Sequence, residues 1–138
     1  MTASNDPNAD VIREFRENAG KVGGRFEGAT LLLLHSIGAK SGEKRVAPVV
    51  YKGDGDRYII FASRAGGPKN PAWYHNLVAN PEVSIELGTE TIEVVARVTE
   101  GEERSEIWEP WKAEVPTFAE YEQRTDREIP VIVLERRS

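Results

Sequence analysis

The chain of 138 residues contains no cysteine, and its only histidines are His35 and His75. The lack of cysteine excludes disulfides and thiol chemistry. With so few histidines a zinc site would need unusual carboxylate ligation, so we expect no metal. The sequence also lacks any run of about 18 apolar residues, and its first ten residues lack the basic and then apolar pattern of a signal peptide. These absences predict a cytoplasmic protein.

Charge is unevenly distributed along the chain. The formal net charge is −5, yet the segment from Lys40 to Lys69 carries seven cations and three acids, a net charge of +4, which leaves −9 for the remainder. The acidic remainder would repel a long polyanion, so nucleic acid is not an expected partner. The basic segment instead favours a small polyanionic ligand, although loop lysines that serve solubility would give the same count.

The order of the expected elements predicts a small barrel. Length and a hydrophobic content of 39% indicate a single domain over residues 10–138, after a disordered lead at 1–9. Hydrophobic patterns predict an amphipathic helix over 10–22 and six strands, at 30–36, 45–51, 57–62, 83–87, 91–98 and 130–134. Because most of these strands are joined as hairpins with helices between the hairpins, we predict a mainly β (α+β) fold with a six-stranded antiparallel barrel.

Several sequence signals mark where the inserted helices begin. Asn70 is expected to be the N-cap of a helix over 71–79, with Pro71 as its first residue. Two later helices are predicted by capping boxes and separated by proline breaks: Thr99-x-x-Glu102 and Thr117-x-x-Glu120, with Pro110 and Pro116.

The loop before the helix over 71–79 has the composition of an anion site. Gly66 and Gly67 allow backbone N–H groups to turn toward a ligand, and Arg64 and Lys69 bring positive charge. The start of the following helix adds its unpaired N–H groups. The same loop type is also common without any ligand, so the pattern by itself leaves both interpretations open.

A second loop, over residues 36–45, displays Lys40, Ser41 and Arg45 between glycines. It resembles a P-loop only superficially, because a P-loop needs an earlier glycine and a following helix, whereas a strand is expected here. Ser41 also lacks the frame of a nucleophile elbow. The loop is therefore interpreted as a hairpin connection suited to phosphate.

Six short motifs, in their order and spacing, resemble the deazaflavin (coenzyme F420)-dependent nitroreductase family over residues 30–134. The motifs are Gly38-Ala-Lys-Ser-Gly42, Arg45-Val-x-Pro48, Ala62-Ser-Arg64, Lys69-Asn-Pro-x-Trp-Tyr-x-Asn76, Ala79-Asn-Pro81 and Thr125-Asp-Arg127-x-Ile-Pro130. The resemblance implies a split β-barrel of the FMN-binding type. It also implies coenzyme F420, an 8-hydroxy-5-deazaflavin with a phosphate and an oligoglutamate tail.

The resemblance further implies which residues bind the coenzyme. Lys40, Ser41 and Arg45 would hold the phosphate and tail, and Pro48 would shape the wall beside the ring. The other implied contacts lie at the polar edge of the ring and along the helix: Ala62, Ser63, Arg64, Ala72, Trp73 and Asn76. Lys69 of the cationic loop is expected to bind the coenzyme as well.

The acceptor side departs from the nitroimidazole-reducing members of that family. Val115 and Phe118 stand where those members carry tyrosines, and only Tyr121 is kept. We therefore expect a quinone or another electron-poor conjugated molecule as substrate, with Tyr121 or Ser63 donating a hydrogen bond to the developing oxyanion. His75 is interpreted either as a proton source or as an exposed helix residue.

Two other classes of function stay open. One is a non-catalytic protein that binds a deazaflavin or flavin, and the other is an FMN-dependent reductase on the same barrel. Two cationic loops exceed what one FMN phosphate needs, which favours the deazaflavin. We expect a monomer or weak dimer, and the mixed charges over 10–22 give no strong case for peripheral membrane contact.

Overall fold

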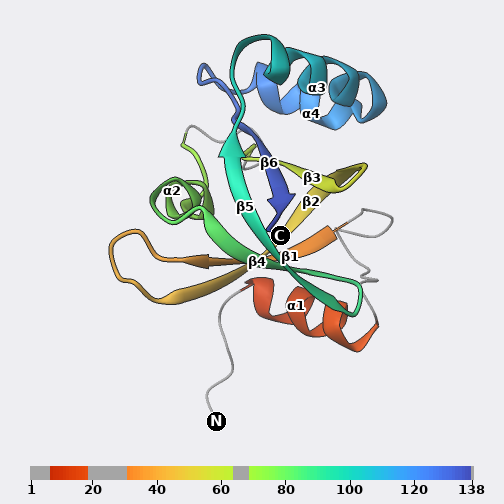
Figure 1. Cartoon of the computed structure of the whole chain (residues 1–138). Coiled ribbons are helices and arrows are strands. Elements are labelled where there is room, and N and C mark those ends of the chain that lie inside the picture. Colours follow the sequence, from red (N-terminus) through yellow and green to blue (C-terminus); the bar gives the residue numbers. More distant parts are fainter. Residues whose placement is uncertain (1–6, 19–30, 64–68, 138) are drawn as a thin grey trace.

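A computed structural model of the chain describes residues 7–18, 31–63 and 69–137. The elements within these residues, shown in Figure 1, are α1 (Pro7–Glu17), β1 (Leu31–Ile37), β2 (Lys44–Asp54), β3 (Arg57–Phe61), α2 (Ala72–Ala79), β4 (Glu82–Leu87), β5 (Glu90–Val98), α3 (Gly101–Glu114), α4 (Pro116–Gln123) and β6 (Val131–Arg136). All six predicted strands are present, each within a few residues of its expected range.

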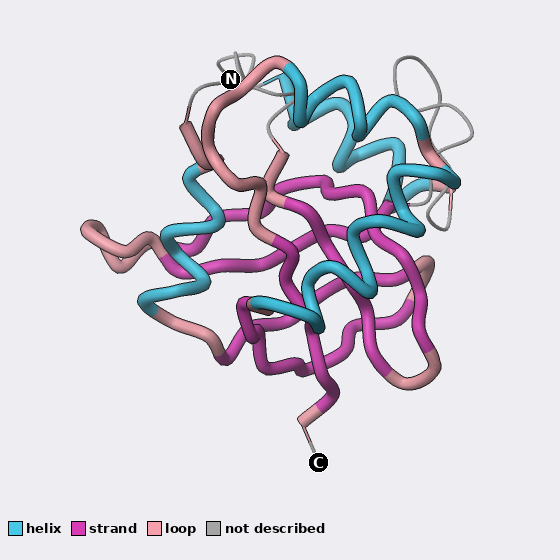
Figure 2. The backbone as a smooth tube through the Cα atoms, turned by 90° about the horizontal axis from the view of Figure 1, so that it is seen from above, coloured by secondary structure: helices cyan, strands magenta, loops and turns pink. Residues whose placement is uncertain are grey.

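The strands close into a barrel in the order β1-β2-β3-β6-β5-β4, and every neighbouring pair is antiparallel. The predicted six-stranded antiparallel barrel is therefore confirmed. β6 lies between β3 and β5, with Phe61 opposite Val131 and Val98 opposite Ile132. Figure 2 shows the strands crossing in the middle of the molecule with the helices around them.

Two tight hairpins connect neighbouring strands. Gly55 and Asp56 form the turn between β2 and β3, and Gly88 and Thr89 the turn between β4 and β5. Gly55 and Gly88 have φ angles of 61° and 55°, in the left-handed region that glycine adopts at least cost. Such two-residue turns match the right-handed twist of the strands, so these glycines help to set the strand register.

The barrel walls are apolar on both faces of β1. Leu32 and Leu34 are fully buried in the barrel interior, where they pack with Ile60, Ile85 and Leu134 among others. Leu31 and Leu33 point the other way and pack under α1 against Phe15, whose side chain is fully buried. This double burial explains why the strand reads as a continuous apolar run rather than an alternating one.

A polar contact fastens α1 to the barrel at its C-terminal end. Arg16 donates to both carboxylate oxygens of Glu86 on β4, at 3.1 and 2.7 Å, and the His35 ring lies 2.5 Å from the same carboxylate. α1 begins at Pro7 and ends at Glu17, whereas the sequence predicted a helix over 10–22 after a disordered lead at 1–9. None of the described helices is long and apolar enough to cross a membrane.

The predicted helix caps were wrong, although the helices exist. The N-cap positions of α2, α3 and α4 are Pro71, Glu100 and Val115, and none makes a side-chain capping bond. Asn70 and Thr99 instead use their side chains across the fold, since Asn70 accepts from Arg127 and Thr99 donates to the Val131 carbonyl. In both cases a tertiary hydrogen bond, part-buried for Asn70 and buried for Thr99, replaces the local cap.

The prolines around the last two helices behave differently from each other. Pro110 lies inside α3 and does not end it, which corrects the predicted break at that position. Pro116 is at the first position of α4, where its missing N–H leaves no intrahelical bond unmade.

We predict that Glu86→Gln loosens α1 in a pH-dependent manner. The hydrogen bond from Arg16 is the main cause that holds the Glu86 pKa below the ordinary value for a glutamate. A carboxylate with a depressed folded-state pKa stabilises the fold fully above the unfolded-state pKa of about 4.3, and this stabilisation is lost as pH falls through the folded-state value. The variant should lower the free energy of unfolding by about 1 kcal/mol at pH 7.

Urea denaturation of parent and variant at a series of pH values measures this difference. The two curves should converge as pH falls through the depressed folded-state pKa of Glu86, because the parent carboxylate is then protonated. Glu90→Gln, on the exposed start of β5, is the matched control and should match the parent throughout. A constant difference at all pH values would contradict the role given to the Glu86 charge.

Candidate functional site

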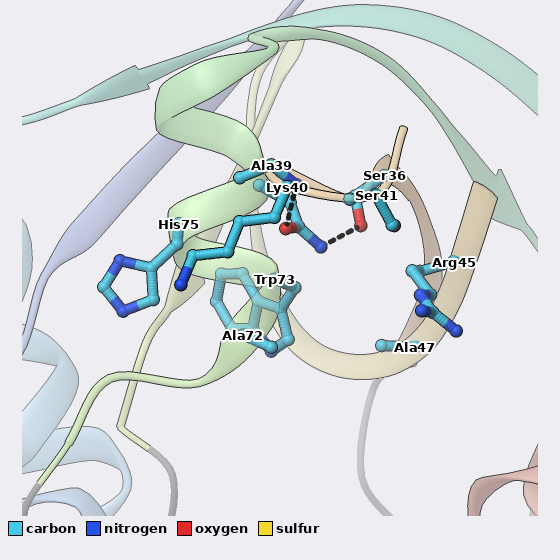
Figure 3. Close-up of a pocket in the computed structure, with 11 residues that line it drawn as sticks. Ser36, Ala39, Lys40, Ser41, Arg45, Ala47, Ala72, Trp73 and His75 are labelled. Atoms are coloured by element: carbon cyan, nitrogen blue, oxygen red, sulfur yellow. Dashed lines mark hydrogen bonds between the residues drawn. The ribbon is translucent and has the colours of Figure 1, made fainter. Parts of the chain in front are cut away.

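An open groove of about 830 Å³ lies between α2 and the hairpin of β1 and β2. We call it the α2 groove, and Figure 3 shows it with its lining side chains. The lining residues are Ser36, Gly38, Ala39, Lys40, Ser41, Arg45, Ala47, Ala72, Trp73, His75 and Asn76. Six predicted coenzyme residues therefore meet at one place: Lys40, Ser41, Arg45, Ala72, Trp73 and Asn76.

Backbone bonds shape the hairpin loop that forms one wall of the α2 groove. The Gly38 N–H donates to the Glu43 carbonyl at 2.8 Å, and the Gly42 N–H donates to the Gly38 carbonyl at 2.9 Å. Gly42 has a φ of 71°, and a Cβ added to Gly38 would fall 2.4 Å from the Ser41 hydroxyl oxygen. Gly42 is favoured by its left-handed backbone conformation, and a side chain at Gly38 would force the Ser41 hydroxyl to move.

The polar groups of this loop are placed to receive an anion. The Ser41 hydroxyl accepts from the Glu43 N–H at 3.2 Å, so its own proton is available for donation outward. Lys40 is exposed at the loop tip, and Arg45 is exposed with one ion pair to Glu43 at 3.1 Å. The lining residues given above include two cations and no carboxylate, although Glu43 of the same loop pairs with Arg45.

The basic segment of the sequence does not form a single patch in the fold. Lys52 pairs with Glu114 at 3.2 Å and lies 5.8 Å from the centre of the Trp111 ring. Arg57 pairs with Asp54 at 2.8 Å. Within the described part of the segment, only Lys40 and Arg45 line the α2 groove. Counting charge along the chain therefore overstated the charge at one site.

The apolar wall of the α2 groove is built by Trp73 and Ala47. Trp73 is half-buried and packs against the barrel interior from α2. Ala47 is among the lining residues and Pro48 is not. Their cross-strand partners explain this difference, because directly opposite residues share a face of the sheet. Ala47 lies opposite Leu34 of the interior, whereas Pro48 lies opposite Leu33, which packs toward α1.

His75 also lines the α2 groove, from an exposed position on α2. Figure 3 places Lys40 and His75 on one side of the view and Arg45 on the other, with Trp73 between them. The arrangement offers a planar ring flanked by polar and cationic groups. It suits a flat molecule that carries negative charge.

The end of β3 is a second region of interest, because Ala62 and Ser63 are buried there. The Arg127 guanidinium donates to the Ala62 carbonyl at 3.1 Å, to the Ser63 carbonyl at 2.7 Å and to the Asn70 side chain at 2.5 Å. Arg127 thereby joins the end of β3 to the chain that enters α2. Arg64 lies outside the described residues, and Lys69 is exposed next to Asn70.

The predicted acceptor residues lie in an aromatic cluster between α3, α4 and the barrel. Phe118 is 8% exposed and packs against Phe61, Trp111 and Tyr121 at centroid distances of 5.6, 5.4 and 5.3 Å. Val115 packs at the edge of the same cluster. Through Phe61, which directly precedes Ala62, this cluster adjoins the end of β3. It contributes no residue to the lining of the α2 groove given above.

No local sequence signal predicts the role of Arg127, although one of the six motifs contains it. Its three acceptors lie 57 to 65 residues away along the chain. The sequence shows only that Arg127 lies shortly before Pro130 and the last strand, and this position does not indicate which groups the guanidinium bonds. Ser36 and Ala39 of the α2 groove were missed for a similar reason, since nothing in their types points to a site.

The closed antiparallel barrel and this groove are typical of a split β-barrel protein that binds a planar anionic molecule. A comparison with protein families matches residues 9–136 to the F420H(2)-dependent quinone reductase family, and the chain belongs to that family. The resemblance found in the sequence was therefore right about the deazaflavin coenzyme of the family. It was wrong in naming a nitroreductase family.

Individual relatives agree with this assignment. An F420H(2)-dependent quinone reductase of Mycobacterium tuberculosis is 39% identical over 127 residues, which cover 89% of this chain and 85% of that protein. A solved F420-H2 dependent reductase, FDR-A, is 42% identical, covers 76% of this chain and 93% of its own, and superposes with a TM-score of 0.69. A structure described as a domain-swapped dimer is 37% identical with the same TM-score, over 91% and 98% of the two chains.

We predict that Arg127→Ala destabilises the end of β3. The Ala62 and Ser63 carbonyls and the Asn70 amide would lose a charged donor in a largely buried place, so the free energy of unfolding should fall by about 2–4 kcal/mol. Arg127→Lys should recover only part of the loss, because an ammonium cannot reproduce the fork of a guanidinium.

Denaturant titration of the purified variants measures both losses. Arg124→Ala is the matched control, because Arg124 is exposed and its guanidinium makes a cation–π contact with the Tyr121 ring, at 5.8 Å from the ring centre. The control should cost less than about 1 kcal/mol. Equal losses for Arg127→Ala and Arg124→Ala would contradict the role given to Arg127.

Proposed function

We propose that this protein is an F420H(2)-dependent quinone reductase that holds its coenzyme in the α2 groove. Membership of the family supports the reaction, and one observation supports the place: Lys40, Arg45 and the Trp73 ring line one open groove without a carboxylate among its described lining residues. The donor set fits the coenzyme, since two cations and a hydroxyl suit a phosphate with an acidic tail and an indole suits a flat ring.

The residues that would hold the coenzyme act in three groups. Lys40, Ser41 and Arg45 bind the phosphate and the tail, and Trp73 with Ala72 lines the ring. Ser63, at the end of β3, and Lys69 would hold its polar edge, and Arg64 is proposed to join them. When bound, the deazaflavin supplies a hydride from its carbon 5.

The protein itself needs to orient the two reactants and stabilise charge on the acceptor. No side-chain nucleophile is required for a hydride transfer, and positioning alone contributes a large part of the rate. We propose that Tyr121 or Ser63 donates a hydrogen bond to the quinone oxygen as negative charge develops on it. Val115, at the partly buried edge of the cluster that contains the buried Phe118, would give an apolar surface on the acceptor side, which favours a quinone over a polar nitro compound.

Our first prediction for this function concerns coenzyme binding. Lys40→Ala or Arg45→Ala should weaken the binding of coenzyme F420 by about 1–3 kcal/mol, as expected for the loss of a charged hydrogen bond. The loss should shrink as the salt concentration rises, because salt screens exposed charges. Fluorescence quenching of the coenzyme measures the affinity at low and high salt.

Lys52→Ala is the matched control for this measurement. Lys52 belongs to the same basic segment of the sequence, but it pairs with Glu114 and lies against Trp111. Its loss should leave the affinity unchanged. A titration with FMN separates the alternative reductase: FMN should bind the parent more weakly, and equal affinities would favour an FMN enzyme or a general flavin binder.

The second prediction concerns the acceptor. With reduced coenzyme F420 the parent should reduce a menadione-type quinone, and a bicyclic nitroimidazole should turn over at least about tenfold more slowly. Tyr121→Phe should lower the quinone rate by about ten- to a hundredfold if its hydroxyl donates to the developing oxyanion. Steady-state assays of both substrates measure these rates.

Tyr51→Phe serves as the control, because Tyr51 belongs to β2 and packs edge-on against Tyr58, at 5.9 Å between ring centres. It should behave as the parent. If Tyr121→Phe also behaves as the parent, Ser63→Ala becomes the decisive variant. Absence of quinone turnover by the parent would overturn the proposed reaction, and brisk nitroimidazole turnover would overturn the proposed acceptor class.

A further inference from the structure

Asn76 of α2 has both ends of its side-chain amide engaged inside the protein. It is 8% exposed, its Oδ1 accepts from the Ala39 N–H at 2.9 Å, and its Nδ2 donates to the Ser36 hydroxyl at 3.2 Å. Figure 3 shows these two bonds as dashed lines that cross from α2 to the end of β1 and to the loop beyond it. The partners lie 37 and 40 residues away along the chain.

These bonds determine how far the loop stands from α2. The loop from Gly38 to Glu43 is closed by its own backbone bonds, so a hydrogen bond to one of its residues helps to place the whole loop. Ala39 directly precedes Lys40, and Asn76 follows Trp73 by three residues, which places it on the same face of α2. The two walls of the α2 groove are thus joined at Asn76. A longer bond of 3.4 Å, from Asn80 to the Ile37 carbonyl, ties α2 only to the end of the strand.

We infer that Asn76 is a positioning residue, whose buried amide sets the spacing between α2 and the loop that carries Lys40 and thereby sets how tightly the α2 groove holds an anionic ligand. The family resemblance had assigned Asn76 to direct contact with the coenzyme. The geometry differs from that assignment, because the amide oxygen and one amide N–H are already committed within the protein. This inference rests on the proposed function.

A double-mutant cycle distinguishes positioning from contact. Asn76→Ala should weaken the binding of coenzyme F420 about tenfold. If Asn76 acts through the placement of Lys40, then Asn76→Ala combined with Lys40→Ala should bind within about twofold of Lys40→Ala alone. If Asn76 instead contacts the coenzyme independently of Lys40, the two losses should multiply. Fluorescence titration of the four proteins gives the cycle.

The ligand-free protein offers a second readout. In the parent, the Ala39 N–H is bonded to Asn76 and should exchange slowly with solvent deuterium. In Asn76→Ala it should exchange at least about tenfold faster, because its acceptor is gone. Asn80→Ala, at the C-cap of the same helix, is the matched control and should leave both the Ala39 exchange and the coenzyme affinity as in the parent.

Ser36→Ala keeps the test decisive if Asn76→Ala does not fold. It removes one partner of the amide by the loss of a single oxygen, and it should weaken coenzyme binding about threefold without adding to Lys40→Ala. Multiplying losses in the cycle, or unchanged Ala39 exchange in Asn76→Ala, would overturn the inference while leaving the proposed function intact. A parent that does not bind coenzyme F420 would overturn both.

Discussion

The closure of the barrel by β6 is the constraint on which the other features depend. β6 is the last strand of the chain, yet it pairs with both β3 and β5 and so removes the edges of the sheet. Its four buried residues, Val131 to Leu134, face the interior and the cluster under α3 in turn. The barrel thereby separates the surface that carries α1 from the surface that carries α3 and α4.

On this barrel, α2 is placed by polar bonds as well as by packing. Leu77 is buried in the barrel interior, while Asn76 holds the loop before Lys40 and Arg127 holds Asn70 at the approach to the helix. Buried amides and guanidinium groups are costly when unpaired, so these contacts select one position for the helix. The α2 groove lies between α2 and the loop that carries Lys40, and the bond from the Ala39 N–H to Asn76 joins these two walls.

The fold places cations that are neighbours in the sequence in different environments. Lys40 and Arg45 reach the α2 groove because they lie on the loop and at the start of β2. Lys52 lies further along β2 and Arg57 begins β3, and they pair with acids of α3 and with Asp54 at the end of β2. The number of cations in the segment favours an anionic ligand, but it does not locate the binding site. Which cations reach the groove and which pair with acids depends on where the strands place them in the fold.

The sequence by itself determined the six strands, their antiparallel pairing, the existence of the helices and six residues of the α2 groove. Hydrophobic alternation, turn glycines and the order of short motifs can be recognised in the sequence alone, because they do not depend on which residues meet in the fold. Only the tertiary structure decided the helix caps, the facing of Ala47 in place of Pro48, and the bonds of Asn70, Asn76, Thr99 and Arg127. The caps and these bonds depend on partners tens of residues away, whose hydrogen bonds outcompete the local choice that the sequence suggests. The facing of Ala47 depends on its cross-strand pairing with Leu34.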